Sequence, residues 1–195
     1  MKNTTFILKL AAILFAIVFV CTFVLVLCNN ITAPIIAQNN AKAEEEAKIA
    51  VLPNAEAFEE IKDFTHPGIT AAFEGKDKSG NFAGYCFKVS TKDNTSKAFG
   101  GEIQMIVGID KELNISGVKI ITMAETPGLG AKASEEAFTD QYKGKADEIS
   151  VTKSGNAGEG EINAISGATI TSKAVTEGVN NALGAANVLK GKEAK

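Results

Sequence analysis

The most apolar stretch of the chain lies near its N-terminus. Residues 10–28, LAAILFAIVFVCTFVLVLC, contain no charged side chain, and a helix of this length, at ~1.5 Å per residue, nearly matches the ~30 Å hydrocarbon core of a bilayer. The pattern predicts one transmembrane helix. Lys2 and Lys9 stand before it and the acidic run 44–46 stands after it, so the positive-inside bias places residues 1–9 in the cytoplasm and the later residues outside the cell membrane.

Two alternatives to a retained anchor fit the sequence less well. A cleaved signal peptide has a small-residue cleavage pattern in AKA at residues 41–43, but the apolar stretch exceeds the usual ~7–15 residues of such a signal, and this pattern lies far beyond it. A lipid anchor at Cys28 would place the bulky Leu27 where such signals have a small residue. We therefore prefer a single-pass membrane segment.

The interval 29–66 predicts a stalk. Residues 29–40 form a polar exit that contains a proline, and residues 41–52 have the Ala, Glu and Lys content of a surface helix that stops before a second proline. Residues 54–64 carry three apolar side chains at helical spacing, which predicts a short amphipathic helix. These side chains are Phe58, Ile61 and Phe64.

Beyond residue 67 the apolar positions change from helical to alternating spacing. Residues 69–75 and 82–91 are β runs joined by the turn-forming sequence DKSG, which predicts a hairpin. Residues 101–109 and 115–122 repeat this plan around DKELN. The two hairpins predict a mainly antiparallel sheet.

The C-terminal part alternates short elements with loops. ASEEAFTDQYKG predicts a short helix that begins at Ser134, and ADEISVTKSG predicts a β run that a loose loop follows. A last helix is predicted from about Ile170 to Leu189, with apolar residues at spacings of three and four. The fold class is thus α+β: one N-terminal transmembrane helix, then at residues 67–195 an extracytoplasmic domain with a mixed, mainly antiparallel sheet flanked by helices.

Composition removes several classes of function. The formal net charge is −3, no basic block stands out beyond the membrane segment, and all 20 cationic side chains are lysines. We therefore expect no nucleic-acid partner, and any bound phosphate lacks an arginine clamp. Cys21 and Cys28 lie in the span. The remaining Cys86 and the single His66 are too few ligands for a zinc or iron–sulfur site. We expect no metal.

Hydroxyl residues crowd the start of the last helix, in the sequence NAISGATITSKAV at 163–175. Serine and threonine there are ordinary helix caps, since they accept hydrogen bonds from the free N–H groups of the first turn. The same N–H groups and the helix dipole also favour an anion such as a phosphate, and Gly167 and Ala168 leave room for it. The residues alone leave both interpretations open. The hydroxyls concerned are Ser166, Thr169, Thr171 and Ser172.

The sequence SGATIT, with the helix behind it, resembles the flavin-attachment motif of two related families. These are the G subunit of the Rnf electron-transport complex and the C subunit of the Na+-translocating NADH:quinone reductase. In both, the threonine after Gly-Ala carries FMN through a phosphoester bond that a separate flavin transferase forms. The resemblance implies covalent FMN on Thr169.

A second motif supports the resemblance to the Rnf G subunit. ETPGLG at residues 125–130 is the signature turn of that family and lies beside its flavin, and Pro127-Gly128 is a type II turn signal. The chain departs from the family at Asn163, where aspartate is usual, and at Met123, where histidine is common. The implied FMN-binding residues are Glu125, Thr126, Gly128, Leu129, Gly130, Ser166, Gly167, Ala168 and Thr169.

The resemblance implies an electron-relay subunit of an Rnf-type ferredoxin:NAD oxidoreductase that moves Na+ or H+. Ferredoxin and NAD sites would belong to partner subunits, because this chain has no nucleotide fingerprint and no cysteine set for clusters. No catalytic residue is expected. The alternative is an anchored extracytoplasmic module that holds a phosphorylated or anionic ligand non-covalently. A serine or threonine hydrolase is disfavoured, because no base accompanies the hydroxyls.

Overall fold

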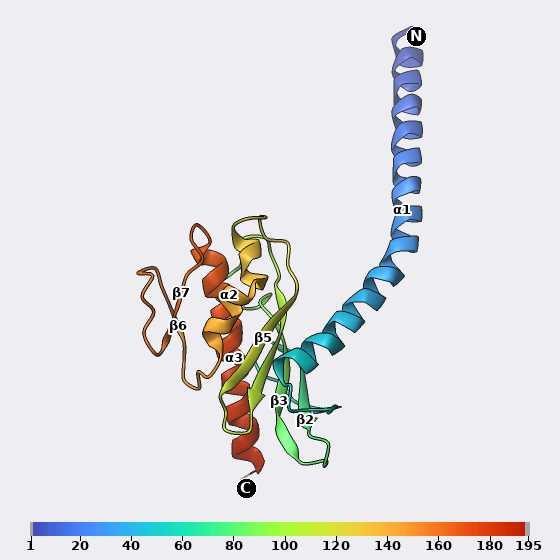
Figure 1. Ribbon diagram of the computed structural model, residues 1–195. Coiled ribbons are helices and arrows are strands. Elements are labelled where there is room, and N and C mark those ends of the chain that lie inside the picture. Colours follow the sequence, from blue (N-terminus) through green and yellow to red (C-terminus); the bar gives the residue numbers. More distant parts are fainter. Residues whose placement is uncertain (1, 194–195) are drawn as a thin grey trace. The chain divides into compact units, whose positions relative to one another are not determined.

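The computed structural model describes residues 2–193, and the chain divides into two compact units between Lys42 and Ala43 (Figure 1). Both units share the long helix α1, Lys2–Val51. The first unit is the part of α1 before the division. The second contains the end of α1 and the folded domain, so this domain begins earlier in the sequence than the boundary at residue 67 that we expected.

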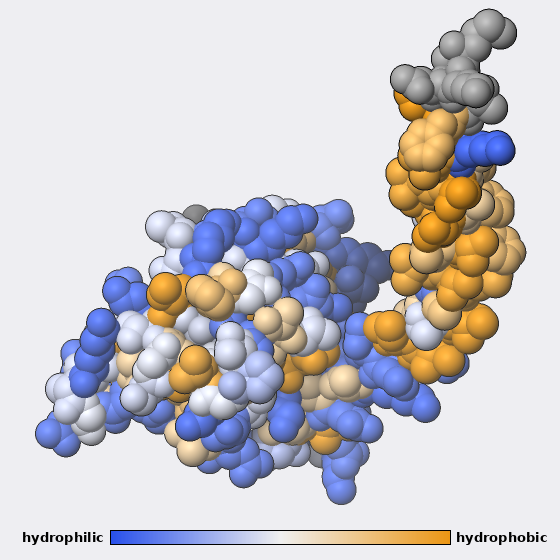
Figure 2. Space-filling view, turned by 90° about the horizontal axis from the view of Figure 1, so that it is seen from above, coloured by the Kyte–Doolittle hydropathy of each residue, from blue (hydrophilic) through white to orange (hydrophobic). Residues whose placement is uncertain are grey.

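Helix α1 is long and apolar enough to cross a membrane. The residues of the segment 10–28 are exposed, and Figure 2 shows apolar residues over the visible surface of the helix. The helix continues through residues 29–40, where the sequence indicated only a polar exit. Pro34 lies inside it. A proline removes one N–H donor and favours a kink, yet it does not have to end a helix.

The second unit is built on a five-stranded antiparallel sheet in the order β1-β2-β3-β4-β5. Both predicted hairpins, β2–β3 and β4–β5, are confirmed. Because neighbouring strands follow one another in the chain, every connection is short and local. The strands are β1 Ala57–Glu60, β2 Ile69–Lys76, β3 Phe82–Ser90, β4 Gln104–Asp110 and β5 Ile115–Thr122.

The amphipathic helix predicted at residues 54–64 is wrong: this segment forms the edge strand β1. It pairs with β2, and the bonds from Glu56 N to Lys76 O and from Ile61 N to Ala72 O are both 2.8 Å long. The apolar side chains of this segment do not share one face, as they would in a helix. Phe58 packs in the apolar cluster around Cys86, whereas Ile61 and Phe64 pack in the main core. Tertiary pairing overrides the local spacing.

Between β5 and the last helix the structure has short elements. The single helix predicted from Ser134 is instead three helical turns, η1, α2 and η2. The β run after it is β6, which pairs in parallel with β7, a strand that the sequence did not predict. The bounds are η1 Gly130–Ser134, α2 Glu136–Thr139, η2 Asp140–Tyr142, β6 Ser150–Thr152, β7 Glu161–Asn163 and α3 Thr169–Glu193.

The two faces of the sheet are covered differently. Helix α3 lies along one face (Figure 1) and forms the main core with the sheet through Val175, Val179 and Ala182, among others. The opposite face receives residues 43–51 of α1 and a smaller cluster with Cys86, whose burial raises its pKa to about 12. The chain therefore buries apolar surface on both sides of the sheet, as an α+β layer architecture requires.

The strand register brings three loops to one end of the sheet. Ser90, the last residue of β3, pairs with Gln104 at the start of β4, and Gln104 pairs with Thr122, the last residue of β5. The loop 91–103 and the segment 123–130 therefore leave the sheet at the same end. The first turn of α3 lies beside them, because residues of all three segments line one cavity.

Candidate functional site

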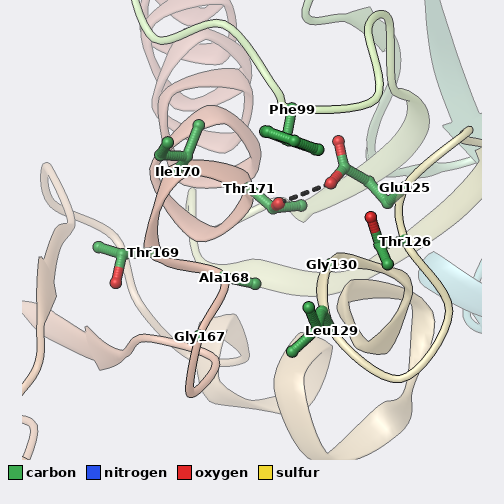
Figure 3. Close-up of a pocket in the computed structure, with 10 residues that line it drawn as sticks. All are labelled: Phe99, Glu125, Thr126, Leu129, Gly130, Gly167, Ala168, Thr169, Ile170 and Thr171. Carbon is green, nitrogen blue, oxygen red and sulfur yellow. Dashed lines mark hydrogen bonds between the residues drawn. The ribbon is translucent and has the colours of Figure 1, made fainter.

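A cavity of about 370 Å³ lies where these three segments meet (Figure 3). The loop between β3 and β4 contributes one side chain, the turn after β5 contributes four residues, and the start of α3 contributes five. Segments far apart in the sequence thus form one concave site of the size that small ligands occupy. The lining residues are Phe99, Glu125, Thr126, Leu129, Gly130, Gly167, Ala168, Thr169, Ile170 and Thr171.

Glu125 connects the three walls of the cavity. It is 8% exposed, and its carboxylate accepts a hydrogen bond from the Gly100 N–H at 2.6 Å and one from the Thr171 hydroxyl at 2.8 Å (Figure 3 shows the second). Each donor is neutral and comes from a different segment. Hydrogen bonds to a carboxylate are stronger than those between neutral groups, so this side chain holds the walls in register.

Two glycines in the turn after β5 are required for different reasons. Gly128 is required for its backbone conformation: its φ is +77°, while no heavy atom lies within 4 Å of the position that a Cβ would take. The Leu129 N–H donates to Thr126 O at 3.1 Å, so residues 126–129 form the turn that Pro127-Gly128 predicts. Gly130 is required for space. A Cβ there would lie 2.2 Å from Glu125 Oε2 and 2.8 Å from Thr171 Oγ1.

The hydroxyls at the start of α3 have different environments. Thr171 is 1% exposed and donates to Glu125 rather than capping the helix. Ser172 is fully buried; its hydroxyl accepts from the Ile165 N–H and donates to Ala168 O, both at 3.0 Å. Thr169, by contrast, is half-buried and lies on the cavity wall. In Figure 3 its side chain points away from Phe99, Glu125 and Leu129, so Thr169 lies at the margin of the cavity.

Comparisons with known proteins identify the family. The model of the FMN-binding domain matches residues 98–184. The G subunit of the Na(+)-translocating ferredoxin:NAD(+) oxidoreductase complex of Acetobacterium woodii is 38% identical over 186 residues, which cover 88% of this chain and 87% of that protein. The chain belongs to this G-subunit family.

Other G subunits agree with this assignment. The G subunit of the proton-translocating ferredoxin:NAD(+) oxidoreductase complex of Clostridium ljungdahlii is 31% identical, over 78% of this chain and 77% of the relative. The G subunit of the ion-translocating oxidoreductase complex of Methanosarcina acetivorans is 33% identical, over 73% and 74%.

Solved structures confirm the fold. The crystal structure of the C subunit of Na(+)-translocating NADH-quinone reductase from Parabacteroides distasonis superimposes with a TM-score of 0.54 and 22% identity, over 77% of this chain and 92% of that chain. NqrC of Shewanella oneidensis gives 0.50 and 20%, over 74% of each chain. At these identities the likeness concerns the fold alone.

The structure brings most of the predicted site residues of this G-subunit chain to the cavity. Ser166 and Gly128 are the exceptions. Both are exposed, and Ser166 lines a neighbouring hollow of about 240 Å³ together with Asn163. The Asn163 Oδ1 atom is buried and has no hydrogen-bond partner within the described chain. The predicted residues on the cavity wall are Glu125, Thr126, Leu129, Gly130, Gly167, Ala168 and Thr169.

Sequence reasoning left three wall residues out of the predicted site. Phe99 lies in no motif that we singled out, while Ile170 and Thr171 lie in SGATIT but were not among the implied FMN-binding residues. Their signal in the sequence is weak: an aromatic residue in a loop and an isoleucine in a helix are ordinary. No lysine stands among the residues that the structure places on this wall, so a phosphate in the cavity has no side-chain cation to neutralise it there.

Proposed function

We propose that this chain is the membrane-anchored flavoprotein subunit that relays electrons through covalently bound FMN in an Rnf-type ferredoxin:NAD oxidoreductase coupled to Na+ or H+ translocation. One observation carries the proposal: the SGATIT segment and the ETPGLG turn, about 40 residues apart in the sequence, line one cavity. Membership of the G-subunit family and the match to the FMN-binding domain support it.

The cavity suits the chemistry of FMN. A flavin ring has an apolar benzenoid edge and a polar pyrimidine edge, and it carries its phosphate on a ribityl chain. Phe99, Leu129 and Ile170 offer apolar surface, while the exposed Thr126 offers a hydroxyl. When bound, FMN supplies one- and two-electron transfer, and the protein contributes orientation, partial burial and polar contacts that tune its potential.

We propose Thr169 as the attachment point. The competing hydroxyls of Thr171 and Ser172 are buried and engaged in hydrogen bonds, and Ser166 lies outside the cavity. Thr169 is half-buried and lies on the wall. A phosphoester there, formed by a flavin transferase, also compensates for the missing cationic clamp, because a bond holds the phosphate without charge pairing. A tethered cofactor is not lost to dilution.

The test of attachment compares two threonines of one helical turn. Wild type, Thr169→Val and Thr171→Val are produced with the flavin transferase, unfolded and weighed as intact chains. We expect FMN to remain on wild type and on Thr171→Val and to be absent from Thr169→Val, whose unfolding free energy should change by no more than about 0.5 kcal/mol, as for an ordinary surface position. Flavin that separates from the unfolded wild-type chain would instead establish the non-covalent binding module.

We also propose that residues 1–9 are cytoplasmic, residues 10–28 span the membrane, and the compact unit that begins at Ala43, which contains the expected domain 67–195, carries the flavin outside. The other subunits of the complex are its partners. The apolar surface of α1 and the lysines before the span support this topology.

The topology can be tested by labelling the β2–β3 turn on intact cells. Ser79 is exposed in this turn, whereas Cys86 is fully buried and the other cysteines lie in the proposed span. A Ser79→Cys chain should react with a membrane-impermeant maleimide from outside, and the parent chain should not. Reaction only after lysis would reverse the proposed orientation.

A further inference from the structure

Phe99 is an unusually exposed aromatic residue for its position. The residue is 75% exposed, although the residue before it, Ala98, is buried. A single exposed apolar residue is ordinary on a protein surface. Phe99, however, lines the cavity together with Ile170 (57% exposed) and Leu129 (44% exposed). Three apolar side chains from three separate segments thus converge on one site.

The loop that carries Phe99 is held to α3. The Asn94 amide, which is buried, donates to Ala174 O at 3.2 Å, and the Glu177 carboxylate accepts from the Thr95 and Ser96 N–H groups at 2.6 and 2.7 Å. Burial acts to raise the pKa of Glu177, but hydrogen bonds from the backbone and side chains of Ser96 and Thr95 together outweigh it and lower the pKa below its ordinary value. The first half of the loop is therefore anchored to α3 by one side chain of the loop, Asn94, and one of the helix, Glu177.

The residue after Phe99 is held as firmly. Gly100 donates to Glu125 at 2.6 Å, and a Cβ on Gly100 would lie 2.1 Å from Ala124 O, so the loop runs directly against the segment after β5. With Ala98 buried on one side and Gly100 bonded on the other, the backbone of Phe99 has a defined position. Its exposure is a property of the folded loop, and a preorganised apolar surface favours binding.

We propose that the isoalloxazine ring of FMN lies between Phe99 and Leu129, with the Phe99 ring stacked on one face of the flavin. This inference rests on the proposed function. In Figure 3, Phe99 and Leu129 lie on different sides of the cavity, and the start of α3 lies between them on a third. Aromatic rings in offset contact attract one another beyond simple burial.

The position of Thr169 favours a flavin over a protein partner as the occupant. Phe99 and Leu129 line the same cavity as Thr169, so both side chains border the space next to the proposed attachment point. Stacking would cover the apolar surface that is now exposed. A protein partner would instead have to insert a side chain into a cavity that the tethered cofactor already fills.

The first experiment uses tryptophan as a reporter of contact. In Phe99→Trp, an indole stacked on the flavin quenches its emission by electron transfer. Val188→Trp is the matched control: Val188 is 43% exposed on the same helix as Thr169, but nineteen residues further along, about 28 Å away at ~1.5 Å per residue. We expect a several-fold loss of flavin emission in Phe99→Trp and none in Val188→Trp.

The second experiment removes the ring. In Phe99→Ala one flavin face opens to solvent, so the quenching constant for iodide should rise about twofold, whereas Val188→Ala should behave as wild type. Intact mass establishes FMN loading in every variant. Loaded Phe99 variants with unchanged emission and iodide quenching would overturn the stacking while leaving the proposed function in place. A wild-type chain without flavin would overturn the proposed function itself.

Circular dichroism and the thermal midpoint show whether each variant folds. If Phe99→Ala folds but loads no flavin while Phe99→Trp loads and is quenched, the requirement for an aromatic ring supports the proposal. If loading, emission and quenching are unchanged and only co-purification of other subunits is lost, Phe99 contacts a protein, and the proposal is wrong.

Discussion

Two carboxylates, one on each side of the five-stranded sheet, are paired in opposite ways. Glu44, in the part of α1 that packs on the sheet, contacts Lys88 at 2.6 Å and Lys48 at 3.4 Å. Glu125, on the side of α3, is bonded only to the Gly100 N–H and the Thr171 hydroxyl within the described residues. One carboxylate is neutralised by two cations, and the other receives neutral donors.

We propose that the difference separates a structural contact from a functional one. Burial acts to raise the pKa of Glu44, but Lys88 and Lys48 outweigh it and lower the pKa below its ordinary value. Lys48 also lies 3.8 Å from the centre of the Phe73 ring. The charges of Glu44 and Lys48 are therefore paired within the protein and need no ligand. Glu125 instead borders the cavity, where its charge acts on whatever is bound. A negative charge beside a flavin disfavours its reduced, anionic forms.

The largest effect is expected from Glu125→Ala, which leaves the buried Thr171 hydroxyl and the part-buried Gly100 N–H without their acceptor. The free energy of unfolding should fall by about 3 kcal/mol, because two hydrogen bonds to a charged group are lost and the Thr171 hydroxyl stays buried. Chemical denaturation of the flavin-free chain measures this. Glu125→Gln keeps an acceptor and should lose less, while raising the flavin potential in the loaded chain. Equal losses in both variants would contradict the hydrogen-bond explanation.

A somewhat smaller loss, about 2 kcal/mol, is expected from Gly130→Ala, since overpacking at a rigid site typically costs about 1–3 kcal/mol. The new Cβ would displace the Glu125 carboxylate from Thr171. In a Glu125→Ala background the closest contact, with Glu125 Oε2, is gone and only those with Thr171 Oγ1 and the residue 125 Cβ remain, so the two effects should be less than additive. Additive unfolding free energies in the double mutant would show that the crowding arises elsewhere.

On the other side of the sheet, Lys48→Met should cost only about 1 kcal/mol, because Glu44 keeps Lys88 and the methionine retains apolar contact with Phe73. Flavin loading and potential should not change. A shift in the flavin potential as large as that of Glu125→Gln would remove the distinction between the two carboxylates.

The smallest effect is expected from Glu177→Gln, about 0.5 kcal/mol near neutral pH, because the amide keeps one acceptor for the loop 91–103. The pKa of Glu177 is lower in the folded chain than its ordinary value of 4.5, so its contribution is present above that value and is lost as the pH falls through the folded pKa. Denaturation curves between neutral pH and pH ~3 should therefore converge for the two chains. If the difference in unfolding free energy between wild type and Glu177→Gln grew on acidification, the stabilising role assigned to the Glu177 carboxylate would be wrong.

Local patterns in the sequence were sufficient for several features. The uncharged run 10–28, the alternating runs of both hairpins and the apolar stripe of α3 each specify their element through period and length alone. The SGATIT and ETPGLG motifs indicated the two segments that meet at the cavity through their resemblance to the flavin-binding motifs of the G-subunit family.

Tertiary contacts decided the rest. The segment 54–64 has helical spacing but becomes a strand because the edge of β2 offers backbone partners, and β7 exists only because β6 lies beside it. The site shows the same division. The sequence contains Glu125, Thr171 and Phe99, but it does not show that they are neighbours. Only the folded chain brings Glu125 into hydrogen-bond contact with Thr171 and puts Phe99 on the cavity wall. Such contacts join residues tens of positions apart, and no periodicity encodes them.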